Sequence, residues 1–307
     1  MHPKELKEAF KRGENISQLL RELNESDVNT EEIITTMYDF QAGSYVDALK
    51  DKDCLDWKIS HGRAIAKEIR ALMPDGGSVL EPGVGEGTTM SFVTQADGEL
   101  GSQFDHIHGF DISWSRVARC RSWLKSQSLG QVFLSVASIF NAPYANNSFD
   151  IVYTSHSIEP NGGAEAAILK ELYRISSRYL ILIEPAYELG SAEARQRMVR
   201  LGYVRGLQEH AERMGMKVLK NELLSVQGNP LNPTGVIVIE KQPDAASAVP
   251  QLACPRYGDA LADFGEAWFS AGSLRAYPII GGLPCFRKSD GVIASQFEAL
   301  NSPVANS

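Results

Sequence analysis

The first part of the chain has the residue spacing of helices. Apolar residues recur at roughly helical spacing over residues 6–23. Asn29 and Glu32 have the spacing of a capping box, which predicts a helix that begins at Thr30. Another helix is predicted over residues 57–73, where the run Pro-Asp-Gly-Gly ends it. We therefore expect the N-terminal region to be helical.

Short, almost continuously apolar runs then alternate with helical stretches. The predicted strands are residues 78–82, 106–112, 131–137, 149–155, 179–183, 217–224 and 236–240. Strands that are apolar along their whole length are typical of a mainly parallel sheet that helices cover on both faces. The pattern therefore predicts an α/β fold built on a doubly wound, seven-stranded, mainly parallel sheet.

A change in composition marks the end of this alternating region. Residues 242–253 are rich in Pro, Ala and Ser and have no periodicity, which is typical of a linker. We expect a helical region at 1–73, a core at 74–241, a small α+β module at 254–290 and a flexible tail at 291–307.

The most informative stretch follows the first predicted strand. Residues 81–87 read Glu-Pro-Gly-Val-Gly-Glu-Gly, and a helix is predicted immediately afterwards. Such glycines let backbone N–H groups approach a ligand at the positive end of a helix dipole. A phosphate loop would have Lys-Ser/Thr after its last glycine, and a dinucleotide loop would have glycine in place of Thr88. Glu81 instead favours a ligand with an ammonium group.

Residues 81–87 closely resemble the glycine loop of class I S-adenosylmethionine-dependent methyltransferases. The resemblance extends from about residue 57 to 241 and includes Asp111 at the end of the second strand, residues 135–159 and residues 184–188. It implies a Rossmann-like methyltransferase core that binds S-adenosylmethionine and releases S-adenosylhomocysteine, with no metal. It also implies that the N-terminal region folds over the cofactor as a lid.

The resemblance also indicates which residues hold the cofactor. Asp111 matches the acidic residue that binds the ribose hydroxyls. Where the family usually has an acidic residue for the adenine amino group, this chain has Ser138. Asp111 as a helix cap, and Ser138 as a loop hydrogen-bonding group, remain alternatives. The expected cofactor-binding set is Glu81, Gly83, Gly85, Gly87, Asp111, Ile112, Ser138, Ile139, Ser155, Tyr38 and Tyr45.

Polar residues beyond the fourth and fifth strands are candidates for the acceptor side. Parallel sheets bind ligands at the carboxyl ends of their strands. We therefore expect His156 and Glu159 to be catalytic, with His156 as the base, and Asn161 to contact the substrate. Glu184 and Glu188 are expected to bind a cationic substrate group. A packing role for His156, and pairing of the two glutamates with arginines, remain open.

The C-terminal segment resembles the small zinc-binding activator protein of eukaryotic tRNA and protein methyltransferases. Residues 277–279 keep its Tyr-Pro-Ile signature, but Cys254 has no second thiolate nearby. A closed zinc site needs four ligands, so we expect a module without zinc. Its core is expected to consist of Phe264, Trp268, Phe269, Tyr277 and Phe286.

Composition narrows the function. The chain has 30 basic and 38 acidic residues, a net charge of −8, which makes nucleic acid an improbable partner. The start of the chain is not a signal peptide, no apolar run reaches the roughly 18 residues of a membrane helix, and no cysteines are paired in sequence. We expect a cytoplasmic protein, with a homodimer left open.

The expected activity is O- or N-methylation of a metabolite or of a sugar- or peptide-derived natural product. RNA or protein methylation, and an inactive scaffold, remain alternatives.

Overall fold

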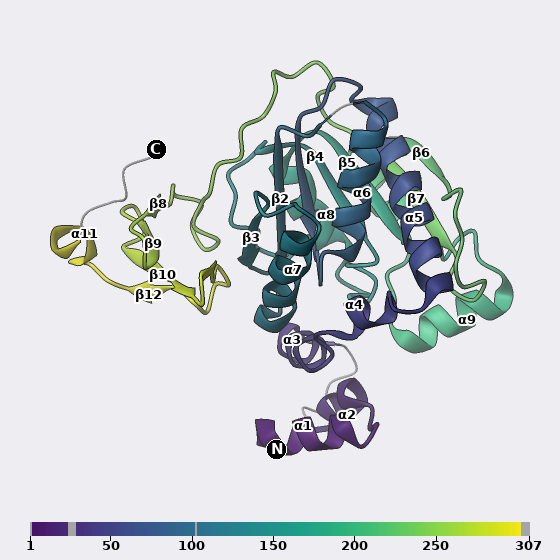
Figure 1. Cartoon of the computed structure of the whole chain (residues 1–307), viewed down its shortest axis with the longest axis horizontal. Coiled ribbons are helices and arrows are strands. Elements are labelled where there is room, and N and C mark those ends of the chain that lie inside the picture. Colours follow the sequence, from purple (N-terminus) through teal and green to yellow (C-terminus); the bar gives the residue numbers. More distant parts are fainter. Residues whose placement is uncertain (1, 24–28, 102, 302–307) are drawn as a thin grey trace.

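The computed structural model describes residues 2–23, 29–101 and 103–301. Its centre is a seven-stranded sheet with helices on both faces (Figure 1). The strands are β1 (Ser78–Pro82), β2 (His106–Asp111), β3 (Phe133–Val136), β4 (Phe149–Ser155), β5 (Ser176–Pro185), β6 (Lys217–Leu223) and β7 (Thr234–Glu240). Their order is β3-β2-β1-β4-β5-β7-β6, and only β7 is antiparallel to its neighbours. The predicted doubly wound, mainly parallel sheet is confirmed.

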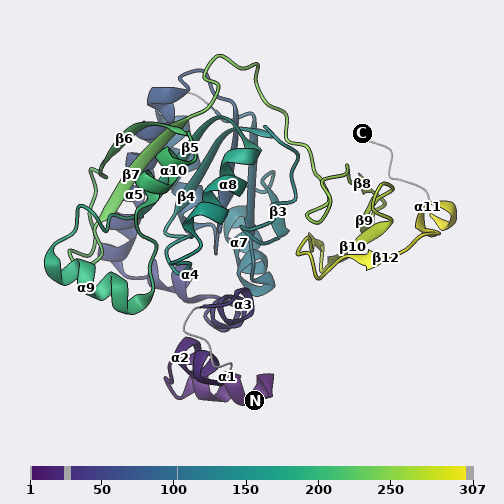
Figure 2. The same ribbon diagram turned by 180° about the vertical axis from the view of Figure 1, so that it is seen from behind.

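Alternate residues of the central strands enter two separate hydrophobic cores. Val79, Ile151 and Ile181 lie in one core, while their neighbours Leu80 and Val152 lie in the other, as the two-residue period of a strand requires. The helices that cover the sheet are α5 (Lys52–Leu72), α6 (Thr88–Glu99), α7 (Trp114–Ser126), α8 (Glu165–Ile175) and α10 (Leu207–Arg213). Helix α9 (Ala192–Leu201) lies beside one end of the sheet (Figure 1). Helices α5, α6 and α7 cover one face, and Figure 2 shows α8 and α10 on the other.

The strand order reverses between β1 and β4. From β1 the chain moves outward through β2 to β3, then returns to place β4 on the other side of β1. The loops after β1 and β4 therefore diverge to opposite faces of the sheet. Such a reversal opens a crevice at the carboxyl ends of the strands, where ligands bind in open α/β sheets.

Four helices precede α5. They are α1 (Pro3–Lys11), α2 (Ile16–Leu23), α3 (Glu31–Phe40) and α4 (Ser44–Ala48). Thr30 caps α3 by accepting a hydrogen bond from the Ile33 N–H. Helix α5 differs from these four because Ile65 and Ile69 are buried in the core between the sheet and α6. Among the described residues, none of the helices is long and apolar enough to cross a membrane.

The C-terminal segment forms a second, smaller sheet beside β3 (Figure 1). Its elements are β8 (Ala262–Asp263), β9 (Ala267–Ser270), β10 (Arg275–Ile280), β11 (Leu283–Pro284), β12 (Val292–Ile293) and α11 (Phe297–Leu300). Cys285 forms a parallel bridge with Val136 of β3, and the Phe286 N–H donates to the Val136 carbonyl at 2.7 Å. The segment thereby pairs with the edge of the main sheet.

The aromatic residues expected to form one small core are divided between two. Tyr277 and Phe286 are buried in the core of the main body, and Trp268 packs against it. Phe264 and Phe269 instead pack together, with ring centroids 5.9 Å apart. The segment is therefore held both by its own small core and by the main sheet.

Cys254 is buried in the core of the main body, together with Tyr277 and Phe286. Its sulfur is 3.2 Å from the Tyr277 hydroxyl and 3.5 Å from the Ser273 hydroxyl. Within the described ranges, no group of three or more His, Cys, Asp or Glu residues is placed to hold a metal ion. The thiol contacts hydroxyl groups in this arrangement.

A buried histidine makes the stability of this fold dependent on pH. His61 of α5 is fully buried, stacks on Trp57 with ring centroids 4.9 Å apart, and lies 3.2 Å from the Ser155 hydroxyl. Burial lowers its pKa to about 3, with smaller contributions from the nearby Lys58 and His156. The unfolded chain takes up this proton near pH 6.5, so the stability present above that pH is lost as the pH falls toward 3.

We expect His61→Phe to remove this dependence while preserving the ring packing. For the unchanged protein, this residue alone contributes a loss of about 2 kcal/mol in the free energy of unfolding between pH 6.5 and pH 5. Denaturant unfolding at several pH values gives the slope of the free energy of unfolding against pH. In the variant this slope should correspond to about one proton fewer taken up on unfolding. His106→Gln, at an exposed position, should leave the slope unchanged. Equal slopes for His61→Phe and the unchanged protein would contradict the assignment.

Candidate active site

A cavity of about 340 Å³ lies at the carboxyl ends of β1, β2, β3 and β4. Its wall is formed by the loops after these strands, by α3 and α5, and by the loop between β6 and β7. Helices α3 and α4 lie beside one end of the sheet (Figure 1). The predicted site residues that line the cavity are Tyr38, Tyr45, Glu81, Gly83, Gly85, Asp111, Ile112, Ser138, Ile139, Ser155, His156, Glu159 and Asn161.

The three glycines after β1 serve different purposes. All have positive φ angles, of 70° at Gly83, 55° at Gly85 and 74° at Gly87. A Cβ at Gly83 would lie 2.3 Å from the Cβ of Ser157, and one at Gly87 would lie 2.6 Å from the sulfur of Cys120. Gly85 has no such obstacle, because the nearest atom would be 3.6 Å away. Gly83 and Gly87 are thus required by packing, whereas Gly85 exposes its backbone to the cavity.

Asp111 ends β2 and fixes the glycine loop. Its Oδ2 accepts a hydrogen bond from the Gly85 N–H at 3.0 Å, and its Oδ1 accepts from the Ser113 N–H at 2.9 Å. Burial raises the pKa of this carboxyl group, while the backbone N–H groups and Arg116 act in the opposite direction. Ser113, not Asp111, provides the side-chain cap of α7. Each Asp111 oxygen has a further lone pair, so the carboxylate can accept from two ligand hydroxyls.

Glu81 and Lys58 place an acidic and a basic side chain on the wall of one cavity. Glu81 is buried and accepts a hydrogen bond from the Tyr153 hydroxyl at 2.7 Å, and burial raises its pKa to about 8. Lys58 of α5 donates to the Thr89 hydroxyl at 3.2 Å and lies 5.3 Å from the ring of Trp57, and burial lowers its pKa. A ligand with both an ammonium and a carboxylate group matches this pair.

Sequence analysis did not select Lys58. A single lysine on a helix is usually exposed to solvent, and no motif surrounds it. The available signal was its spacing from His61, one helical turn later on α5, which puts the two residues on the same face.

Glu86 connects the glycine loop to the N-terminal helices. It is fully buried, and its carboxylate accepts hydrogen bonds from the N–H groups of Gly43 at 2.9 Å, Tyr45 at 3.3 Å and Val46 at 2.9 Å. The residue before α4 is a glycine and provides no side-chain cap. Glu86 therefore caps α4 from a distant part of the chain.

Arg116 of α7 makes a second connection to the same helices. Its guanidinium donates to the Tyr38 carbonyl at 3.0 Å and to the Gln41 side chain at 3.1 Å. It also lies over two aromatic rings, 4.7 Å from the centroid of Tyr38 and 4.3 Å from that of Tyr45. Tyr38 and Tyr45 are thereby fixed at the cavity wall by a buried cation.

Asp39 of α3 makes a third connection, at the N-terminus of α7. It accepts hydrogen bonds from the Ser113 hydroxyl at 2.8 Å and from the N–H and hydroxyl of Ser115 at 3.1 and 3.0 Å. A carboxylate at this position is stabilised by the helix dipole. The cover formed by α3 and α4 is thus held by three charged side chains.

His156 lies beyond β4 with a partner at each ring nitrogen. Nδ1 is 2.9 Å from Oε2 of Glu159, and Nε2 is 2.9 Å from the hydroxyl of Thr234. The backbone of His156 has a φ angle of 52°, which is uncommon for a residue with a side chain. Such conformations cluster at functional sites. The carboxylate orients the imidazole toward the cavity wall that both residues line.

Glu184 and Glu188 do not line the cavity. Glu184 is buried, and its carboxylate accepts from the N–H groups of Ser157 at 3.1 Å and Ile158 at 3.4 Å. Burial raises its pKa to about 7. Glu188 accepts from the Gly206 N–H at 2.6 Å. Glu184 therefore supports the loop that carries His156, and binding of substrate by these two glutamates stays a prediction.

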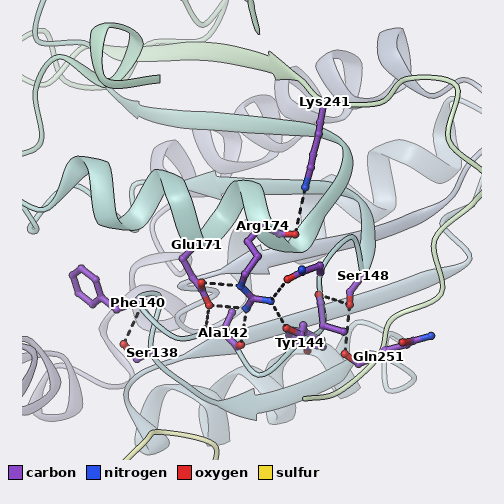
Figure 3. A network of polar contacts seen from close by, with 11 residues as sticks. Ser138, Phe140, Ala142, Tyr144, Ser148, Glu171, Arg174, Lys241 and Gln251 are labelled. Carbon is purple, nitrogen blue, oxygen red and sulfur yellow. Dashed lines mark hydrogen bonds and ion pairs between the residues drawn. The ribbon is translucent and has the colours of Figure 1, made fainter. Parts of the chain in front are cut away.

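The loop between β3 and β4 carries Ser138 and is supported by Arg174 of α8 (Figure 3). Arg174 donates to the Tyr144 carbonyl at 2.7 Å and pairs with Glu171 at 2.7 Å. Glu171 in turn accepts from the Ala142 N–H at 2.8 Å. These contacts fix the loop from the side opposite the cavity.

Comparisons with known proteins identify the domain that contains this site. Residues 79–177 match the family model described as a methyltransferase domain, which covers less than half of the chain. A search of curated proteins found no match. The matched segment begins in β1 and ends in β5, and it includes the glycine loop, Asp111 and His156. The chain therefore carries a methyltransferase domain.

Solved structures with a similar fold include methyltransferases. Magnesium protoporphyrin IX methyltransferase from Synechocystis PCC 6803 with bound SAM is 13% identical, and the match covers 71% of this chain and 100% of that one, with a TM-score of 0.51. The same protein with bound SAH gives 14% identity, coverage of 69% and 99%, and a TM-score of 0.50. A SAM-dependent methyltransferase from Aquifex aeolicus is 16% identical. The match covers 57% of this chain and 87% of that one, with a TM-score of 0.43. At these identities the likeness shows the fold.

The Glu86 cap predicts a measurable change in α4. We expect Glu86→Ala to leave three backbone N–H groups without their acceptor, because nothing else caps this helix. Hydrogen exchange of the amides of Gly43, Tyr45 and Val46 should accelerate by about tenfold or more, since bonds to a charged group contribute about 1.5–3 kcal/mol. Glu99→Ala, at the exposed end of α6, is the control and should leave these rates unchanged. Unchanged exchange in Glu86→Ala would exclude the capping role.

Proposed function

We propose that this protein is an S-adenosylmethionine-dependent methyltransferase that methylates an oxygen or nitrogen atom of a small molecule. The observation that carries the proposal is the order of polar groups along the cavity. Glu81, Asp111 and Ser138 lie at the carboxyl ends of β1, β2 and β3, which are adjacent in the sheet. When bound, S-adenosylmethionine supplies a methyl group on a sulfonium that is already activated for transfer.

The residues of the cavity fit the parts of that molecule. Glu81 accepts from the ammonium group, whose positive charge favours the ionised form of this carboxyl group, and Lys58 on the same wall pairs with the carboxylate. Asp111 accepts from the ribose hydroxyls, and Gly85 allows close approach of its backbone. Tyr38 and Tyr45 close the cavity and exclude water, which favours the reaction of a nucleophile held close to the methyl group.

His156, oriented by Glu159, can accept the proton that the methyl acceptor loses. Glu159 accepts the Nδ1–H of the imidazole, so Nε2, which accepts from the Thr234 hydroxyl, is the nitrogen that can take up a proton. The Thr234 hydroxyl lies beside Nε2 and is the group that an acceptor displaces or through which its proton passes. Glu159 then stabilises the imidazolium. The side chain of Asn161, at the same wall, orients the acceptor.

Two features support a small acceptor. The cavity of about 340 Å³ is covered by α3 and α4, which are fixed by Glu86, Arg116 and Asp39. The chain also has a net charge of −8, which disfavours a polyanionic substrate. A macromolecular acceptor would have to enter past this cover. Methylation of RNA should weaken steeply with added salt, whereas turnover of a small acceptor should not.

Cofactor binding is tested most directly at Asp111. We expect Asp111→Ala to raise the Kd for S-adenosylhomocysteine by at least about tenfold, because it removes charge-assisted hydrogen bonds to the ribose. Calorimetry on the purified protein measures this change. Asp105→Ala, at an exposed position before β2, is the matched control. An unchanged Kd for a folded Asp111→Ala variant, or no binding by the unchanged protein, would refute the assignment.

The role of His156 is tested by its substitution. Transfer of labelled methyl groups from S-adenosylmethionine into a metabolite extract measures the rate. His156→Ala should lower the rate by about 100-fold or more and leave the affinity for S-adenosylhomocysteine nearly unchanged. His210→Ala, on α10, serves as the control. A variant that keeps its rate, or that loses cofactor affinity instead, would indicate a packing role.

A further inference from the structure

One carboxylate of the cavity has no role in the function proposed above. Glu31, in the first turn of α3, lines the cavity together with Ser138, Ile139 and Phe140 from the loop after β3. The Ser138 hydroxyl donates to Oε2 of Glu31 at 3.1 Å. The N-terminal region thus places an acidic group at the β3 end of the site.

The strand order determines which part of the cofactor lies there. Neighbouring strands are about 4.8 Å apart, so Glu81, Asp111 and Ser138 mark three successive positions along the cavity. With the amino acid part at Glu81 and the ribose at Asp111, the remaining part at β3 is the base. Ile139 and Phe140 provide apolar contacts for a planar ring.

Ser138 is a weaker acceptor for a base than Glu31. Its hydroxyl hydrogen is donated to Glu31, and its oxygen accepts from the Phe140 N–H at 3.2 Å, which leaves one lone pair. Glu31 retains free lone pairs on both carboxylate oxygens, and a charged acceptor forms the stronger hydrogen bond. The main hydrogen-bond acceptor that this wall presents to a ligand is therefore Glu31, and Ser138 orients it.

The position of Glu31 is fixed through α3. The other end of this helix is held against α7 by Asp39 and by the bond from Arg116 to the Tyr38 carbonyl. The Glu31 carboxylate is thus carried by a helix that is attached to the core. The contacts that attach this helix lie within ten residues of Glu31 in the sequence.

We propose that Glu31 selects the 6-amino purine of the cofactor by accepting a hydrogen bond from its exocyclic amine. This inference rests on the proposed function. It assigns to the N-terminal region, and not to the loop after β3, the acidic group that distinguishes adenine from a 6-oxo purine. A 6-oxo base presents a carbonyl oxygen in place of the amine. This oxygen is repelled by the carboxylate and cannot donate a hydrogen bond to it.

The test compares two ligands that differ only at this position. Calorimetry on the full chain measures the Kd values of S-adenosylhomocysteine and S-inosylhomocysteine. We expect the unchanged protein to prefer the adenine ligand by about tenfold or more, because a hydrogen bond to a charged group is involved. Glu31→Ala should reduce this ratio to below about threefold, and Glu31→Gln, which keeps the shape of the side chain, should reduce it by at least about threefold.

Two further variants separate this role from a general effect on the site. Glu32→Gln, one residue later on α3 and outside the cavity wall, should retain the preference. Ser138→Ala should reduce it less than Glu31→Ala does. A preference that survives in both Glu31 variants, or one that depends on Ser138 more than on Glu31, overturns the proposal.

The proposed function can fail separately. If the unchanged protein binds neither ligand, cofactor binding itself is refuted. If it binds S-adenosylhomocysteine and the ratio does not respond to Glu31, only the assignment of Glu31 fails.

Discussion

The site depends on three charged side chains between the N-terminal helices and the sheet, of which Glu86 and Arg116 are fully buried and Asp39 is partly buried. Glu86 caps α4, Arg116 stacks between Tyr38 and Tyr45, and Asp39 binds the N-terminus of α7. A buried charge is costly unless its hydrogen bonds are made, so α3 and α4 cannot leave without exposing or orphaning these groups. The cavity is therefore a property of the cover and the glycine loop together.

The central fold and half of this cavity could be predicted from the sequence because they depend on local patterns. A buried parallel strand needs an apolar run, and a strand-to-helix turn such as that at Gly83 needs glycine, so both leave a signature within a few residues. Asp111 and His156 could be selected for the same reason, because Asp111 ends one recognisable strand and His156 directly follows another. Comparison with a methyltransferase domain rests on this part of the chain.

The other half of the cavity could not be predicted because its residues acquire their roles from distant partners. Glu86 looks like one more residue of the glycine loop until its three acceptor contacts to residues 43–46 are formed. Lys58 and Glu31 lie on helices whose orientation the sequence pattern does not specify. Glu184 shows another limit of the pattern. It lies near the end of β5, one strand further from the reversal than β4, and its carboxylate accepts from backbone N–H groups.

The pairing of Cys285 with Val136 has a consequence for how the molecule meets other chains. An unpaired edge strand is a template for association with a second copy, and β3 is the edge of the large sheet. The C-terminal segment occupies that template with Phe286 and buries Tyr277 behind it. Since the partner strand is synthesised long after β3, the nascent chain carries an open edge until the segment arrives. In the folded protein the segment covers this edge at Val136, where a second copy could otherwise pair.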